Sequence, residues 1–135
     1  MLFRSSLLML ASYYGHLDTV QVLLAHEADP DLRNNNGQTP IAGAAFKGNL
    51  PMIELLLEHG ADIEGASPDG RTALMIAAMF DRTEIVDYLM AHGASVEATD
   101  VNGVSAIGAA NRMGAADTPP QLERILHRVQ RSPQS

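Results

Sequence analysis

A period of 33 residues is the feature that most constrains the fold of this chain. Residues of the same or similar type recur at this interval in six columns. Four of them are Ser6, Thr39, Thr72 and Ser105; Ala11, Ala44, Ala77 and Ala110; Gly15, Gly48, Asp81 and Gly114; and Leu23, Leu56, Leu89 and Leu122. The other two are His26, His59 and His92, and Gly37, Gly70 and Gly103. Six columns at one spacing indicate a tandem array, in which each unit packs mainly on its neighbours.

Each unit repeats the same order of local signals. Two apolar segments, separated by Gly or Asp, have helical spacing, as in Ile85, Val86, Leu89 and Met90. A glycine such as Gly60 or Gly93 then predicts a left-handed helix end. A dipeptide whose residues favour the positive φ angles of a hairpin turn follows: Asn36-Gly37, Asp69-Gly70 and Asn102-Gly103. The unit is therefore predicted to be helix, turn, helix, hairpin.

This unit resembles the ankyrin repeat. The resemblance is carried by residues 37–45 (GQTPIAGAA), 55–62 (LLLEHGAD), 70–78 (GRTALMIAA) and 92–94 (HGA), and it extends from residue 4 to about residue 117. It implies an all-α repeat fold, an ankyrin-type α-solenoid of stacked helix-turn-helix units with short β-hairpin loops and a concave surface. We expect a single domain over residues 1–131, with repeats at about 1–33, 34–66, 67–99 and 100–131.

Three departures from the family pattern carry expectations of their own. The His of the family's Thr-Pro-Leu-His tetrapeptide is absent from all four repeats, so its hydrogen bond to the hairpin is lost. Glu27 stands where Gly60 and Gly93 end the other second helices, which predicts either backbone strain or a different helix ending. Asp81 replaces the glycine between the two helices, and Asp tolerates the left-handed region better than most residues.

The two ends of the chain differ from the internal repeats. A capping helix is expected from Pro119, with Thr118 as N-cap and Gln121 as its capping-box partner, and residues 132–135 are expected to form a frayed tail. Residues 1–5 lack a preceding hairpin strand, as in an N-terminal capping repeat. Two alternatives remain open, namely that the first residues belong to a signal peptide and that the chain is a fragment of a longer array.

Composition and charge exclude several classes of function. The formal net charge of −7 argues against a nucleic-acid-binding protein, which needs Lys and Arg to neutralise phosphates. No apolar run reaches the roughly 20 residues that span a membrane, and a chain without cysteine has no disulfide or thiolate zinc site. We expect a cytoplasmic location ahead of a periplasmic or secreted one.

Candidate catalytic and metal-binding residues are explained by the repeat. Ser105 belongs to the Ser/Thr column, so a nucleophile is not expected. His26, His59 and His92 occur once per repeat, about 10 Å apart, too far for a shared metal, and are expected to support the ends of the second helices. The acidic columns, Asp31, Glu64 and Glu97 with Asp29 and Asp62, suggest calcium, but solvated charge at the hairpin edge is the favoured interpretation. We expect no enzymatic activity, no cofactor and no metal.

The candidate site is the concave face. In proteins of the family, partners are usually met by the hairpin tips and by the two residues before the glycine between the helices. The helix positions are Tyr13, Tyr14, Phe46, Lys47, Met79, Phe80, Arg112 and Met113, and the tip positions are Asn36, Gln38, Asp69, Arg71, Asn102 and Val104. Tyr, Phe, Met and Arg are enriched at interface centres, so a continuous stripe across the array is expected.

These features predict a non-enzymatic protein–protein interaction module or scaffold that is a monomer. Two alternatives stay open. In the first, the chain is a structural or regulatory array that self-associates or packs on a missing domain. In the second, the aromatic side chains only cover the inner ends of the helices.

Overall fold

The structure is a computed structural model that describes the backbone of residues 2–131 and the side chains of residues 7–128. The predicted tail at 132–135 lies outside the described residues. Eight helices follow one another in the described part: α1 (Leu2–Tyr13), α2 (Leu17–Ala25), α3 (Pro40–Lys47), α4 (Leu50–Glu58), α5 (Ala73–Met79), α6 (Thr83–Ala91), α7 (Ala106–Met113) and α8 (Thr118–Arg131). The predicted all-α repeat fold is confirmed.

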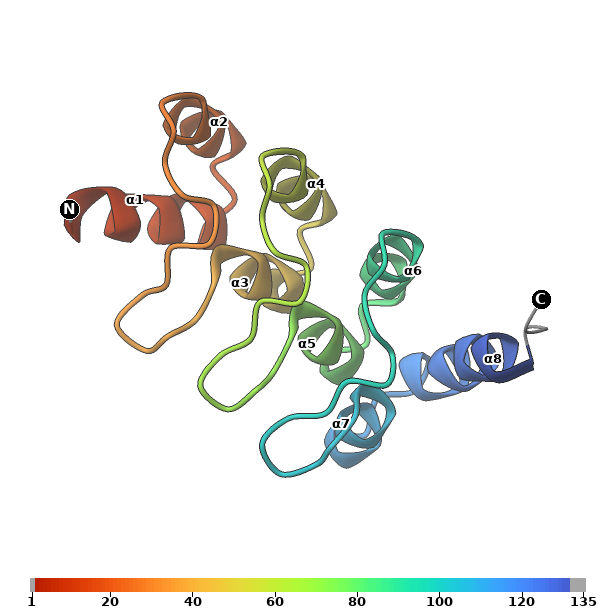
Figure 1. Cartoon of the computed structure of the whole chain (residues 1–135). Coiled ribbons are helices and arrows are strands. Elements are labelled where there is room, and N and C mark those ends of the chain that lie inside the picture. The colour runs from red at the N-terminus through yellow and green to blue at the C-terminus, as the bar shows by residue number, and fades with distance from the viewer. Residues whose placement is uncertain (1, 132–135) are drawn as a thin grey trace.

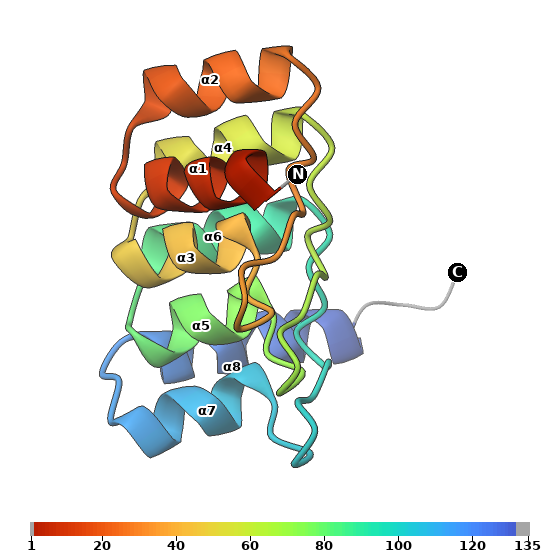
Figure 2. The same ribbon diagram turned by 90° about the vertical axis from the view of Figure 1, so that its left-hand side faces the viewer.

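The helices form two rows (Figure 1). The first helices of the pairs, α1, α3, α5 and α7, pack one on the next along the inner row. The second helices α2, α4 and α6 form the outer row, and α8 packs on α7 while also contacting α5 and α6. The loops between pairs project to the same side of the array (Figure 2). One helix pair per period thus gives four stacked pairs.

Small side chains hold the inner row together. Ala11, Ala44, Ala77 and Ala110 are all buried, the last three completely. An alanine has no atom beyond Cβ, so neighbouring helices can approach closely around it. The outer row packs behind them through the leucine column, in which Leu56, Leu89 and Leu122 are completely buried. Aromatic residues, 4% of the chain, are not required for this core.

Side-chain caps fix where the inner helices begin. Thr39, Thr72 and Ser105 each take the N-cap position, and each hydroxyl accepts a hydrogen bond of 3.3 Å from the amide three residues later. Such a cap is worth about 1 kcal/mol. The hydroxyl column of the sequence is therefore a column of N-caps for α3, α5 and α7.

The hairpins differ from the predicted turn. At the first of them only Gly37 has a positive φ, 77°, and its amide donates to the carbonyl of Asn34. The amide of Asn34 in turn donates to the carbonyl of Gln38, which makes a type I turn followed by a left-handed glycine. The expectation that Asn36 also takes a positive φ was wrong. Gly37 is further required because a Cβ there would lie 2.6 Å from Cγ of Pro68 in the next hairpin.

The hairpins form almost no sheet. Among residues 2–131, one isolated antiparallel bridge joins Thr99 and Ser105. Successive hairpins instead contact one another near their tips, where the amide of Val101 donates to the carbonyl of Asp69 at 2.9 Å. The projecting loops therefore act as stacked turns whose spacing is set by the helices beneath them.

Two non-glycine residues adopt left-handed backbone conformations. Glu27 has a φ of 68° and Asp81 one of 62°, close to the glycines of their columns. Of the two outcomes expected for Glu27, the structure therefore shows the strained one. A side chain in this region costs roughly 1 kcal/mol relative to glycine.

We predict that Glu27→Gly raises the free energy of unfolding by about 0.5–1 kcal/mol, because it removes this strain. The matched change is Gly60→Ala, at the equivalent position of the second repeat, where φ is 92° and a Cβ would meet nothing within 4 Å. It should lower stability by a similar amount, about 1 kcal/mol. Urea unfolding followed by circular dichroism measures both, and a Glu27→Gly variant less stable than the original chain would contradict the argument.

The predicted capping box of the last helix was wrong. Helix α8 begins at Thr118 itself, and the Thr118 hydroxyl donates to the carbonyl of Ala78 at 2.6 Å. The side-chain amide of Gln121 donates to the carbonyl of Thr83 and to the Asp87 carboxylate, both at 2.9 Å. These polar side chains bond to the preceding repeat instead of to each other.

Asp81 of the third repeat takes over the capping of α8. Its Oδ1 accepts hydrogen bonds of 2.9 Å from the amides of Asp117 and Thr118, the first groups of that helix. These bonds, that of Thr118 first, hold the pKa of the Asp81 carboxyl below its usual value. A negative charge at a helix N-terminus is also favoured by the helix dipole. The carboxylate thus compensates for the strained backbone that carries it.

We predict that Asp81 makes the stability of the chain depend on pH. Its folded pKa is lower than its unfolded pKa of about 4, so the stabilisation is complete above pH 4 and is lost as the pH falls through the folded value. The Asp81→Asn variant, which keeps an oxygen acceptor without the charge, should melt lower near pH 7 and lose this difference in acid. Glu97→Gln, an exposed acid without a described hydrogen bond, is the control. A melting difference for Asp81→Asn that does not shrink in acid would contradict the cap.

Candidate functional site

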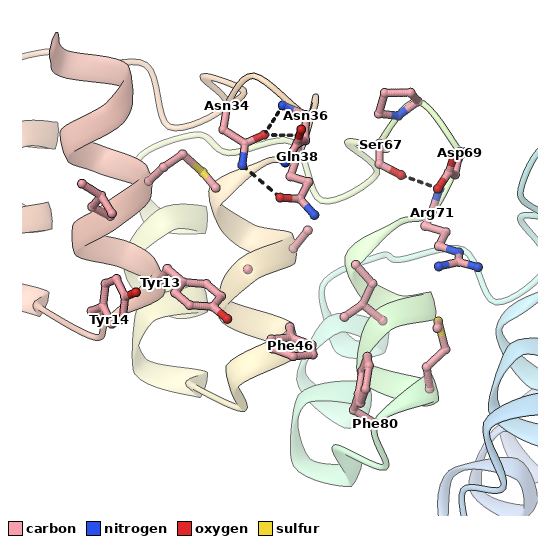
Figure 3. Close-up of a pocket in the computed structure, with 17 residues that line it drawn as sticks. Tyr13, Tyr14, Asn34, Asn36, Gln38, Phe46, Ser67, Asp69, Arg71 and Phe80 are labelled. Carbon is pink, nitrogen blue, oxygen red and sulfur yellow. Dashed lines mark hydrogen bonds between the residues drawn. The ribbon is translucent and has the colours of Figure 1, made fainter. Parts of the chain in front are cut away.

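A groove runs between the inner helices and the stacked hairpins (Figure 3). Its volume is about 960 Å³. Nine of the predicted residues line it: Tyr13, Tyr14, Asn36, Gln38, Phe46, Asp69, Arg71, Met79 and Phe80. They come from α1, α3 and α5 and from the two hairpins between these helices, so the first three repeats build this groove together.

Three aromatic rings from three successive repeats form a ladder along the groove. The rings of Tyr13 and Phe46 are stacked, with centroids 6.3 Å apart and an interplanar angle of 9°. Phe46 meets Phe80 edge to face at 4.7 Å and 88°. Figure 3 shows these rings following one another from α1 through α3 to α5. Both geometries are favoured by the ring quadrupole and hold each ring in a defined orientation.

The ladder is packed on one side and open on the other. Tyr13 and Phe80 are half-buried, whereas Phe46 is 38% exposed. Tyr14, which follows Tyr13 on the helix, is 63% exposed and meets the Tyr13 ring edge-on at 5.2 Å. The two neighbouring tyrosines thus point in different directions, so that Tyr13 is half-buried and Tyr14 is exposed. The rings therefore contact one another and also present aromatic surface to the groove.

The hairpins form the opposite, polar wall. Asn34 organises the first of them, because its Oδ1 accepts from the amides of Asn36 and Gln38 and its Nδ2 donates to Oε1 of Gln38. In the second hairpin, the Ser67 hydroxyl accepts from the amide of Arg71 at 3.3 Å. The side chains of Asn36, Asp69 and Arg71 lie at the exposed surface. This wall can supply hydrogen bonds and one charge of each sign.

Five predicted residues lie outside the groove lining. Lys47 places its Nζ 4.7 Å from the centroid of the Tyr13 ring, which is a cation–π contact. Arg112 and Met113 continue the stripe on α7, both exposed, while Asn102 and Val104 belong to the third hairpin, which the Asp100 carboxylate holds by accepting from their amides. The predicted stripe thus does not form one groove across four repeats.

The groove also contains residues that the sequence analysis did not select. Leu10, Gly43 and Ile76 lie one turn before the aromatic positions, and their column could have been found from the i, i+3 spacing. Met9 and Ala42 are their neighbours along α1 and α3, and Asn34, Ser67 and Pro68 come from the hairpins. Met9, Leu10, Ala42, Gly43 and Ile76 together make the helix side of the groove apolar next to the ring ladder.

The histidine column was predicted to support the ends of the second helices, and two of its three members, His59 and His92, do so. Nδ1 of His59 lies 3.1 Å from the carbonyl of Leu55, and Nδ1 of His92 lies 2.8 Å from that of Tyr88. Within the described residues, no three His, Cys, Asp or Glu side chains gather where they could hold a metal ion.

The first acidic column has a different role from the one expected. The Asp31 carboxylate accepts from the amide of Asp62 at 2.9 and 3.1 Å, and the Glu64 carboxylate accepts from the amide of Ser95 at 2.7 Å. The interpretation as merely solvated charge was therefore wrong for these two residues. They join each repeat to the next.

Charge is divided between the two rows. Residues 16–32, 49–65 and 83–98 contain the outer helices and the loops after them. These segments have Asp and Glu residues but no Lys or Arg. The acids are Asp18, Glu27, Asp29, Asp31, Glu54, Glu58, Asp62, Glu64, Glu84, Asp87 and Glu97. These negative charges affect Tyr88. Burial is the largest cause of the raised pKa of its phenol, and the charges of Glu54 and Glu58 raise that pKa further.

The inner helices and hairpins carry the opposite balance. Residues 33–48, 66–82 and 99–114 contain five cations, Arg33, Lys47, Arg71, Arg82 and Arg112, and three acids, Asp69, Asp81 and Asp100. A chain with a formal charge of −7 therefore has a local excess of cations along its inner face.

Two of these five cations are committed to the fold. Arg33 donates to the carbonyls of Gly37 and Ala66, and Arg82 donates to that of Phe46 at 2.8 Å, at the end of α3. The side-chain nitrogens of Lys47, Arg71 and Arg112 make no hydrogen bond or ion pair to the described residues. Of these three cations, Arg71 lines the groove, while Lys47 beside Tyr13 and Arg112 on α7 lie outside its lining.

Comparison with known proteins identifies the fold family. A family model described as ankyrin repeats (3 copies) matches residues 8–100. A comparison with curated proteins gives no match. No helix among the described residues combines the length and apolar character needed to cross a membrane. The family match covers more than half of the sequence, and the fourth helix pair, α7 and α8, lies beyond it. The chain belongs to the ankyrin repeat family.

Proposed function

We propose that this protein is a non-enzymatic binding module that holds another protein in the groove on its concave face. Ankyrin repeats are in general protein–protein interaction modules. The observation that carries the proposal for this chain is the ring ladder of Tyr13, Phe46 and Phe80, which runs through three repeats and lies along a groove.

The ladder is suited to binding because its rings are already ordered. Ring contacts at 6.3 and 4.7 Å fix their orientation before a partner arrives, so little side-chain entropy remains to be lost. Tyr14, 63% exposed beside them, has a large apolar face that the fold itself does not bury. A partner would cover both, while the hairpin wall would satisfy its backbone polar groups.

The lining of the groove favours binding over catalysis. Among the described residues that line it, Asp69 is the one carboxylate and there is no histidine. Its one serine, Ser67, accepts a backbone hydrogen bond within its own turn. A nucleophile paired with a general base, which covalent catalysis needs, is not assembled by these side chains.

We predict that the double variant Tyr14→Ala/Phe46→Ala loses capture of the partner while remaining folded. Both side chains are exposed, so their removal should cost the fold at most about 1–2 kcal/mol, less than a core truncation. Immobilised protein would be used to capture interactors from a lysate of the source cell, with quantitative mass spectrometry as readout.

The control for this experiment is Tyr88→Ala, which removes a half-buried aromatic side chain from the outer row. The proposal expects Tyr88→Ala to keep the interactors that the groove variant loses, and circular dichroism to show both variants folded. Equal capture by the groove variant and the original chain would contradict binding in the groove. Unfolding of the groove variant would show instead that these rings are part of the core.

Self-association is the second candidate function, and exposed apolar residues of the first helix pair favour it. Leu7 is 45% exposed and Val22 58%, whereas their counterparts in the next repeat, Pro40 and Leu55, are buried and half-buried. The internal repeats cover these positions with the preceding helix pair. Light scattering over a dilution series separates the two functions, because a binding module without self-association keeps the mass of a monomer.

A further inference from the structure

We propose that the occupant of the groove is an acidic peptide segment of another protein, with aromatic or aliphatic side chains on the ring ladder and carboxylates toward Lys47, Arg71 and Arg112. The inference rests on the proposed function, since it names the chemistry of the partner for the same groove. It is carried by the division of charge between the two rows and by the three uncommitted cations.

The division of charge is directional. Every charged Asp, Glu, Lys or Arg side chain of the segments that contain α2, α4 and α6 is acidic, while the inner row has more cations than acids. An acidic molecule is therefore repelled by the side of α2, α4 and α6 and meets fewer acids at the inner face. Charges farther apart than the Debye length of about 10 Å at moderate salt are largely screened, so the local cations decide binding.

The three cations differ from the other inner cations because their side chains make no hydrogen bond or ion pair to the described residues; Lys47 has its cation–π contact with Tyr13. Arg33 and Arg82 bond to backbone carbonyls and would remain where they are without a ligand. Lys47, by contrast, is an exposed residue whose Nζ lies over the Tyr13 ring, and Arg71 lines the groove from the second hairpin. A long, exposed and unpaired cation next to apolar surface matches a ligand in which a carboxylate adjoins an apolar side chain.

The acids of the inner face do not cancel this preference. Asp81 is bonded to the start of α8, and Asp100 accepts from the amides of Asn102 and Val104 in its own turn. The pKa of Asp100 is lowered by its hydrogen bond to Val104 first and, among smaller causes, by Arg71 and Arg112. Both arginines therefore lie near enough to the third hairpin to act on its Asp100 carboxylate, Arg71 from the groove lining and Arg112 from α7. Asp69 alone is left as an acid facing the ligand.

This geometry gives the ligand a polarity. Aromatic surface is densest at the α1 end, where Tyr13, Tyr14 and Phe46 meet, whereas Arg71 precedes α5 and Arg112 lies beyond the groove on α7. A segment with its apolar residues toward α1 and its carboxylates toward α7 would fit both, and Lys47 would take a further carboxylate at the aromatic end. Nucleic acid fits less well, because its continuous phosphates would face the acids of the outer row and find only three free cations.

The test uses a phage-displayed library of short random peptides selected on the immobilised full chain. Peptides that bind in the groove are recognised by loss of binding to Tyr14→Ala/Phe46→Ala. We expect these peptides to carry net negative charge together with aromatic or aliphatic residues. Synthetic copies should bind more weakly as ionic strength rises, because surface ion pairs are screened by salt.

Charge reversal then tests the named cations. Lys47→Glu/Arg71→Glu should weaken binding of a selected peptide by about tenfold or more in fluorescence anisotropy. The matched control is Arg124→Glu/Arg128→Glu, which makes the same change in net charge at exposed positions on α8, outside the groove lining. It should change the affinity by less than about twofold at moderate salt.

The outcomes separate this inference from the proposed function. Selection of groove-dependent peptides that are neutral or basic would overturn the proposal that the ligand is acidic. The same conclusion would follow if neither double charge reversal changed the affinity of the selected peptide. In both cases the proposal that the groove binds a partner would remain. Equal losses with both double reversals would also overturn the acidic ligand, because net charge alone would then explain the effect. Peptides that bind Tyr14→Ala/Phe46→Ala as well as the original chain would overturn both. Selection of phosphate-rich oligonucleotides in a parallel pool, in preference to acidic peptides, would exclude a peptide as the occupant.

Discussion

The close packing of the inner helices around alanine is the interaction on which the other features of this protein depend. Ala44, Ala77 and Ala110 are completely buried between successive helices of one row, and no larger side chain would fit there without moving the row apart. Because this contact recurs every 33 residues, each position of the unit is placed next to its own copy in the neighbouring repeat. The ring ladder follows from this register, since aromatic residues in equivalent or adjacent columns are brought within 4.7 to 6.3 Å of each other. The stacked hairpins follow from it as well.

Many polar side chains that look like isolated surface groups in fact join one repeat to the next. Asp31 and Glu64 accept hydrogen bonds from backbone amides 31 residues later, and Asp81 caps a helix that begins 37 residues later. In a solenoid the neighbouring repeat is the only source of such long-range partners, so stability is spread over the interfaces between units. The outer row can thus be strongly acidic while several of its acids remain useful to the fold. On the inner face Arg33 and Arg82 also bond to the backbone, which leaves Lys47, Arg71 and Arg112 without a hydrogen bond or ion pair to the described residues.

The repeat period, the helix pairs, the alanine column and the left-handed helix ends at Gly60 and Gly93 could be predicted from the sequence because each depends on local pattern repeated several times. Nine groove residues were found by placing the partner-binding positions of the ankyrin repeat on this period. What could not be predicted depended on partners in another repeat. Thr118 and Gln121 have the spacing of a capping box, in which their side chains would accept from backbone amides. Instead these side chains donate hydrogen bonds to Ala78, Thr83 and Asp87 of the preceding repeat. The close approach of Pro68 in the next hairpin, which leaves no room for a Cβ at Gly37, is likewise a contact between repeats that the local sequence does not reveal. The groove ends at α5 because the fourth repeat has Arg112 and Met113 where earlier repeats have rings. This difference is visible in the sequence, but its effect on the shape of the groove could not be predicted from it.

Hydrogen–deuterium exchange of the full chain, with and without its captured protein partner, is the most direct test of the claim that the inner face is the binding surface. The account predicts slower exchange on binding at residues 34–38 and 67–71 and at the ends of α1, α3 and α5 that carry the rings, with α2, α4 and α6 unchanged at their exposed faces. Protection confined to the outer helices, or to α8, would contradict it.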